Sequence, residues 1–339
     1  MIKRWFFIAV ILFVGILIGW FSRYFYIHTI RNMQISQRTS NPTLRQKTSD
    51  PLVSPLLACT VSENKPSREF TPLKTVIQNV IDSKKTDDIL IDISVYFRDL
   101  ATGNWTGIGE NKQYSPASLF KIPILIAYFK KAETDPSILQ EQIQYQTNFP
   151  QDIPQIIKPV QTLTLGQFYA IDQLLKQMIV DSDNISEELL LSHLDMNYIQ
   201  EVFSDLGLNP SIFSENADTM SAKSFSLFFR ILYNATYLNR VMSEKTLELL
   251  TRSNFTKGIT AGLPKNIKIA HKFGERTYVS PTTKTVIVRQ LHECGIIYIP
   301  NKPYLLCVMT KGTDYEKLED IMKSISHGVY TYMTSLTTK

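Results

Sequence analysis

The sequence has little from which a metal centre or a framework of disulfide bonds could be built. It holds three cysteines and five histidines in 339 residues, and none of them show the short spacings that metal sites use. We therefore expect no metal ion and no cofactor, and we expect the cysteines to be buried thiols. The cysteines are Cys59, Cys294 and Cys307.

Positive charge is scarce outside the N-terminal part of the chain. The formal net charge is +5, but residues 1–50 hold seven Lys and Arg residues against one Asp, which leaves −1 for residues 51–339. A surface that binds a phosphate backbone needs an excess of basic side chains. The sequence therefore argues against nucleic acid as a partner of the globular part.

The stretch from Trp5 to Ser22 has no charged residue at all. At about 1.5 Å per helical residue it can just cross a hydrocarbon layer of roughly 30 Å, so we predict a membrane helix in residues 5–22. The residues that follow are bulky and aromatic, whereas a cleavable signal ends in small residues. This favours an uncleaved anchor over residues 1–26, and the flanking charges do not decide its orientation.

Large apolar residues are few in residues 27–69, which are rich in Ser, Thr, Asn, Gln and Pro. Such a segment buries too little surface to fold by itself, and we expect a polar linker there. Folding should begin near Phe70, so we predict one domain over residues 70–339 with a helical subdomain at about 130–250.

Within the predicted domain, strand patterns occur at both ends and helical patterns occur between them. The strands are expected at residues 91–108, 266–274, 285–300 and 303–312, and the helices include 73–81, 165–184, 185–194, 196–208, 221–238 and 315–335. This arrangement predicts an α+β fold, in which both chain ends build one antiparallel sheet, helices flank it, and a helical subdomain is inserted.

A serine and a lysine lie three residues apart where a polar segment meets an apolar helix, in the stretch SPASLFKIP. Ser115 can cap this helix and Pro116 suits its first turn, so that Ser118 and Lys121 fall on one face. An amine at that distance can take the hydroxyl proton. A helix cap followed by a solvated lysine would look the same, and the motif recurs in Ser62-Glu-Asn-Lys65, so Ser-x-x-Lys alone is weak evidence.

Two further motifs follow Ser-x-x-Lys along the chain. Ser182-Asp183-Asn184 lies at the end of a predicted helix, and Lys272-Phe273-Gly274 lies in a predicted strand. With Ser-x-x-Lys they form the signature of the penicillin-recognising serine hydrolases, and the sequence resembles class A β-lactamases most closely. The resemblance covers roughly the last two-thirds of the chain, from the strand ISVYFRDL to the final helix.

The resemblance implies a catalytic role for four side chains. Ser118 would be the acylated nucleophile and Lys121 its base. Ser182 would relay the proton to the leaving nitrogen, and Lys272 would supply positive charge beside Ser182 and the substrate carboxylate. Acyl transfer needs such an activated nucleophile and proton path.

The resemblance also implies a substrate-binding strand. Asn184 would orient the substrate amide, and the backbone N–H of Glu275, next to Gly274, would complete the oxyanion hole with that of the nucleophile. Phe273 departs from the family pattern, which usually has a hydroxyl residue there to bind the substrate carboxylate. Arg276 could replace that contact through its planar guanidinium, and a surface salt bridge is an alternative interpretation.

A second departure concerns hydrolysis of the acyl-enzyme. Efficient class A enzymes carry a loop with a glutamate that positions the deacylating water. The segment from Leu206 to Thr219 is short for that loop, and Glu215 is its only local candidate, with an exposed loop residue as the alternative. His271 should point away from its neighbour Lys272 on an alternating strand, which favours a structural role.

These observations predict a serine hydrolase that opens β-lactam rings. The alternatives are a D-alanyl-D-alanine carboxypeptidase that β-lactams acylate slowly, and an inactive cell-wall-binding or scaffold protein with the same fold. We expect a single-pass membrane-anchored protein with a monomeric catalytic domain outside the cytoplasm, where β-lactams and cell-wall peptides occur.

Overall fold

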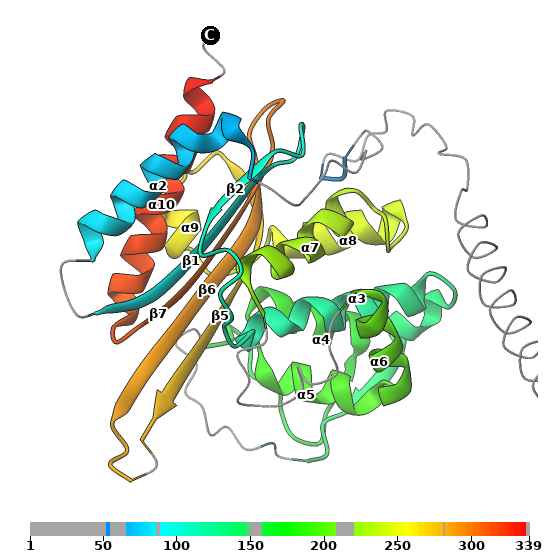
Figure 1. The fold of residues 1–339 in the computed structure, drawn as a ribbon. Helices are drawn as coiled ribbons and strands as arrows, with labels where there is room; N and C mark the ends of the chain where they lie inside the picture. The colour runs from blue at the N-terminus through cyan, green and yellow to red at the C-terminus, as the bar shows by residue number, and fades with distance from the viewer. Residues whose placement is uncertain are drawn as a thin grey trace, which may run out of the picture. The chain divides into compact units, whose positions relative to one another are not determined.

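A five-stranded antiparallel sheet separates two groups of helices (Figure 1). The computed structural model describes residues 52–54, 66–85, 89–147, 149, 158–207, 220–280 and 282–336. The strands are β1 (Leu90–Asp99), β2 (Trp105–Ile108), β5 (Lys268–Val279), β6 (Val286–Tyr298) and β7 (Tyr304–Gly312), in the spatial order β2-β1-β7-β6-β5. The last strand of the chain therefore pairs with the first, with Val95 opposite Val308, and the predicted sheet from both chain ends is confirmed.

One face of the sheet is covered by α2 (Thr71–Lys84), α9 (Gly258–Ala261) and α10 (Tyr315–Ser335) (Figure 1). The apolar side chains of α2 recur at three- and four-residue spacing, and Leu73, Ile77 and Ile81 are buried. They share an apolar cluster with Val95 and Phe97 of β1. The predicted first and last helices are confirmed.

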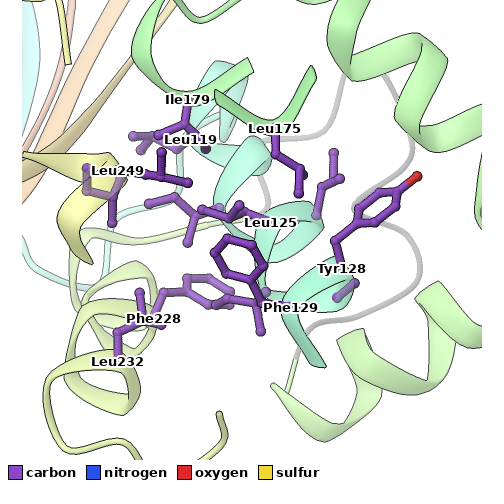
Figure 2. Packing of buried hydrophobic residues seen from close by; sticks show 14 of the residues in the cluster. Leu119, Leu125, Tyr128, Phe129, Leu175, Ile179, Phe228, Leu232 and Leu249 are labelled. Atoms are coloured by element: carbon purple, nitrogen blue, oxygen red, sulfur yellow. The ribbon is translucent and has the colours of Figure 1, made fainter. Parts of the chain in front are cut away.

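The other face carries the helices of the middle of the chain. They are α3 (Lys121–Ala132), α4 (Ile171–Val180), α5 (Asn184–His193), α6 (Met196–Asp205), α7 (Ala222–Tyr233) and α8 (Arg240–Leu250). The 3₁₀ segments are η1 (Arg68–Phe70), η2 (Ala117–Phe120) and η3 (Pro136–Gln140). A helix that is apolar on every side must be buried, and α3 from Lys121 to Phe129 has no exposed residue. Figure 2 shows Leu125 and Phe129 among side chains of the neighbouring helices, including Leu175 and Phe228.

The prediction of one helix over residues 165–184 is wrong in part. Strand β4 (Phe168–Ala170) pairs with β3 (Gln142–Gln144) in a second, two-stranded sheet, and the helix occupies only Ile171–Val180. The apolar residues before Ile171 fit a strand as well as a helix over so short a stretch. The helix ends before Ser182, which leaves Ser182 and Asp183 in the α4–α5 connection and Asn184 at the start of α5.

The expectation that the cysteines are unpaired thiols is wrong for two of them. Cys294 of β6 and Cys307 of β7 face each other in the hairpin register and form a disulfide bond, with both side chains fully buried. The hairpin turn at Pro300–Pro303 brings these residues together across the two strands. Cys59 lies outside the described residues.

The predicted membrane helix in residues 5–22 and most of the predicted linker lie outside the described residues. Among the helices that the structure describes, none combines the length and the apolar character that crossing a membrane requires. Residues 52–54 are described, and Leu52 and Val53 are buried in the apolar cluster of the helical side. The backbone N–H of Ser54 donates a hydrogen bond to Tyr233 O at 2.6 Å.

Candidate active site

Ser118 lies in η2, at the point where the chain enters the buried helix α3. The residue before it, Ala117, has a φ of 47°, a left-handed conformation that is uncommon for a residue with a side chain. The prediction that Ser115 caps the helix is wrong, because η2 begins without a side-chain cap. Ser115 Oγ instead accepts a hydrogen bond at 3.2 Å from Nη1 of Arg276, a residue of strand β5.

Lys121 begins α3 and turns its fully buried side chain toward Ser118, with 3.3 Å between Nζ and Oγ. The predicted Ser-Lys pair on one face is therefore present. Lys121 Nζ also donates to Ser182 O and to Asn184 Oδ1, both at 2.6 Å, and lies 3.4 Å from Ser182 Oγ. A buried ammonium needs such oxygen acceptors to replace water.

The Ser-Asp-Asn motif reaches this group from the end of the α4–α5 connection and the first residue of α5. Ser182 has a φ of 57°, and its side chain is buried. Asp183 caps α5 by accepting a hydrogen bond from Ser186 N at 2.8 Å, so the middle residue of the motif has a structural task. The cap holds the first turn of α5, and with it Asn184, against Lys121.

Lys272 approaches from strand β5 and is fully buried. Its Nζ donates to Ser182 Oγ at 2.8 Å and to Phe273 O at 2.9 Å. Burial lowers the pKa of Lys272 well below its ordinary value of 10.5, and the positive charge of Lys121 lowers it further; the carboxylates of Glu187 and Glu275 act in the opposite direction. The structure thus brings Ser118, Lys121, Ser182 and Lys272 into one chain of contacts.

Gly274 is required by the close approach of β5 to the nucleophile turn. A Cβ at this position would lie 3.0 Å from Leu119 N and 3.1 Å from Pro116 O, both of them backbone atoms. A side chain there would push the strand away from Ser118. The next residue of β5 is Glu275, whose backbone N–H was predicted to complete the oxyanion hole.

Phe273 is packed inside the protein and does not offer a hydrogen-bonding group. Its ring is 1% exposed and stacks on Phe255, with 4.5 Å between the ring centroids. The ammonium of Lys272 lies 4.3 Å from the centre of the same ring. Arg276, two residues after Gly274, is partly buried and lies beside Ser115, with its guanidinium 5.1 Å from the ring of Tyr278.

The structure also places Glu187 at the site, a residue that none of the three sequence motifs indicates. Glu187 Oε2 lies 3.3 Å from Lys121 Nζ. It belongs to α5 and stands three residues after Asn184, so both side chains are on one helix face and contact the same ammonium. That spacing is visible in the sequence, and it was the available signal.

Other candidates lie away from these contacts or outside the described residues. Glu215 is outside the described residues, and its predicted role is untested. His271 Nδ1 lies 2.7 Å from Glu293 Oε1, and both side chains are buried between the sheet and α9. Within the described part of the chain, no group of three or more His, Cys, Asp or Glu side chains could hold a metal ion.

The model of the β-lactamase enzyme family matches residues 72–333, which is most of the chain. The chain belongs to this β-lactamase family. The match begins in α2 and ends in α10, so it includes the sheet, both groups of helices and every residue of the candidate site. Family membership supports a serine β-lactamase-like hydrolase. No curated protein sequence matches the chain significantly.

Solved structures show the same fold. PBP-A has a TM-score of 0.64 at 21% identity, over 81% of this chain and 100% of that one. A β-lactamase from Xanthomonas campestris pv. campestris has a TM-score of 0.62 at 18% identity, over 77% and 97%. A class A β-lactamase from Mycobacterium abscessus has a TM-score of 0.62 at 18% identity, over 76% and 99%. The family and fold expected from the three motifs are confirmed.

Proposed function

We propose that the protein is a serine hydrolase that forms an acyl-enzyme at Ser118 and opens β-lactam rings. The observation that carries this proposal is the convergence of three motifs distant in the chain. Ser182 Oγ lies within 2.8 Å of Lys272 Nζ and 3.4 Å of Lys121 Nζ, and Lys121 Nζ lies 3.3 Å from Ser118 Oγ. Nucleophile, base and proton relay are therefore in contact before substrate binds.

Acylation follows from these contacts. Lys121 in its neutral form takes the proton of Ser118, whose Oγ attacks the lactam carbonyl and forms a new C–O bond. The backbone N–H groups of Ser118 and Glu275 stabilise the oxyanion, which is typically worth about 3 kcal/mol for one donor. The C–N bond of the lactam breaks, and the leaving nitrogen takes the proton of Ser182, which Lys121 replaces across 3.4 Å.

The remaining groups bind and orient the substrate. Lys272 offers a buried ammonium beside Ser182, where it attracts the carboxylate that β-lactams carry. Asn184 holds its amide 2.6 Å from Lys121 and presents it to the substrate amide. Since Phe273 has no hydroxyl, Arg276 is the side chain of β5 that takes over carboxylate binding.

A D-alanyl-D-alanine carboxypeptidase is the second candidate function, and a specific observation favours it. The sequence between α6 and α7 lacks the Glu-x-x-Leu-Asn pattern of efficient class A β-lactamases. A peptidase uses the same serine and lysines for acylation. A mutant of PBP-A, a protein with the same fold, has a solved structure described as an acyl-enzyme complex with penicillin G.

We also propose a location outside the cytoplasm, with the catalytic domain acting as a monomer tethered by residues 5–22. The Cys294–Cys307 disulfide supports this location, because such bonds persist mainly in oxidising compartments. The uncharged stretch at the N-terminus supports the tether. Alkaline extraction of membranes from expressing cells should leave the full chain in the pellet, and release into the supernatant would contradict the tether.

A fluorescent penicillin tests the proposed function on the full chain. A label that appears and then disappears indicates β-lactam hydrolysis, and a persistent label indicates a penicillin-binding peptidase, which release of D-alanine from a D-alanyl-D-alanine peptide would support. Ser118→Ala should abolish labelling while the circular dichroism spectrum stays unchanged. Wild-type protein that no β-lactam labels would contradict the proposal and leave the scaffold interpretation.

A further inference from the structure

Glu187 is a carboxylate at the centre of the site that the acylation steps do not use. Its Oε2 lies 3.3 Å from Lys121 Nζ, and its side chain is 19% exposed, whereas that of Lys121 is 0% exposed. The Glu187 carboxylate therefore contacts Lys121 from a side that water can reach. Helix α5 fixes it there, since Asp183, the residue directly after Ser182, caps the first turn of this helix.

Glu187 is not the main hydrogen-bond acceptor of Lys121. Lys121 Nζ already donates two short hydrogen bonds, to Ser182 O and to Asn184 Oδ1, both at 2.6 Å. Charge-assisted hydrogen bonds to carboxylates are usually about 2.7–2.9 Å long, so the 3.3 Å ion pair with Glu187 is a longer contact than these two hydrogen bonds. The carboxylate is close enough to exchange a proton with Lys121 and keeps lone pairs for a water molecule.

The position of Glu187 relative to the nucleophile suits attack by water. Ser118 Oγ and Glu187 Oε2 each lie 3.3 Å from the same nitrogen, so they are separated by at most twice that distance. One water molecule, with hydrogen bonds of about 2.8 Å, can reach both the carboxylate and an acyl carbon attached to Ser118 Oγ.

We propose that Glu187 is the general base that hydrolyses the acyl-enzyme, a role that rests on the proposed acylation of Ser118. Water attacks the acyl carbon and gives its proton to Glu187 Oε2. The tetrahedral intermediate then breaks the bond between that carbon and Ser118 Oγ. Glu187 passes its proton to Lys121 across 3.3 Å, and Lys121 passes a proton on to the serine oxygen across 3.3 Å, which restores the carboxylate, the neutral amine and the serine and releases the acid.

The proposal is tested by measuring acylation and deacylation separately on the full chain with a fluorescent penicillin. Glu187→Gln keeps the size of the side chain and removes the base. We expect this variant to be labelled within a few-fold of the wild-type rate and to lose its label about 100-fold more slowly, so that the acyl-enzyme accumulates. Glu187→Asp keeps a carboxylate on a shorter stem and should give an intermediate rate.

The matched control is Glu188→Gln, which removes the same charge from the next, exposed residue of α5. This variant should lose its label at the wild-type rate. Label loss from Glu187→Gln within twofold of wild type, or an equal slowing in Glu188→Gln, overturns the assignment. So does a wild-type label that lasts as long as that of Glu187→Gln.

A failure of the proposed function gives a different result. If wild-type protein is never labelled, acylation itself is wrong. If wild-type protein is labelled but folded Glu187→Gln is not, Glu187 belongs to acylation and the role proposed for it in hydrolysis is wrong. Should Glu187→Gln fail to fold, the Glu187→Asp variant still decides, because a wild-type rate of label loss from that shorter carboxylate contradicts the proposal.

Discussion

The two sides of the candidate site differ in how closely they follow the family pattern. The helical side supplies Ser118, Lys121, Ser182 and Asn184, which are joined by hydrogen bonds of 2.6–3.4 Å. The strand side, on β5, keeps Lys272 and Gly274 of the family pattern. It has Phe273 in place of the expected hydroxyl residue, and the Phe273 ring packs on Phe255.

This difference separates chemistry from recognition. The groups that would attack the carbonyl carbon and break the C–N bond lie in contact, whereas the groups that would bind a substrate carboxylate are rearranged around Arg276 and Ser115. Changes on the helical side should therefore alter the acylation rate of every substrate, and changes far along β5 should alter only affinity. The four variants below test that division, beginning with the largest expected effect.

Lys121→Met removes the amine from the helical side and keeps an unbranched side chain. Acylation should fall by about 10²–10⁴, the usual contribution of a general base, because the proton of Ser118 has no acceptor. Stopped-flow labelling with a fluorescent penicillin measures the rate. Lys176→Met, at an exposed position of α4, is the matched control, and equal losses in both variants would contradict the role of Lys121.

Gly274→Ala tests the contact between the two sides. The new Cβ would lie 3.0–3.1 Å from backbone atoms of the nucleophile turn, which must shift to admit it. Such overpacking typically costs about 1–3 kcal/mol, so we expect acylation to fall about tenfold and the thermal midpoint to decrease. An unchanged acylation rate would show that β5 is not held against Ser118 as described.

The lowered pKa of Lys272 predicts the pH dependence of the strand side. As pH rises through that pKa, below 10.5, the ammonium loses its charge, and acylation by carboxylate-bearing β-lactams should fall about tenfold. Over the same range the free energy of unfolding should rise, because the unfolded chain binds the proton that native Lys272 has lost. Lys272→Arg should move the fall in activity to higher pH, and an unchanged profile would contradict this role.

Arg276→Ala should have the smallest effect. It removes the hydrogen bond to Ser115 and the proposed carboxylate contact, so we expect KM to rise a few-fold with kcat nearly unchanged, and a stability loss of about 1 kcal/mol. Lys268→Ala removes the same charge from the exposed start of β5 and is the control. A large loss of kcat instead would place Arg276 in the chemical step.

The fold could be predicted from the sequence, and so could the candidate side chains of the three motifs, because the motifs depend on local spacing. These side chains are Ser118, Lys121, Ser182 and Lys272. Ser118 and Lys121 are one helical turn apart, and the order of strands and helices limits how the three motifs can meet. Glu187 was missed since the helix ISEELLLSHL carries two adjacent glutamates, and only packing shows which of them contacts Lys121.

Contacts between distant strands were the other gap. The disulfide depends on the register of the β6–β7 hairpin, which places Cys294 opposite Cys307. The bond from Arg276 to Ser115 depends on how β5 approaches η2, and no local pattern in the sequence specifies it. Both features come from tertiary packing that a single sequence does not display.

The position of the acyl group on the full chain is the measurement that tests the central claim most directly. Intact-mass spectrometry after a short exposure to penicillin G, followed by peptide mapping, should show one added penicillin, attached to the peptide that contains Ser118. A penicillin on the second Ser-x-x-Lys motif at Ser62, on Ser182, or on no peptide would contradict the account.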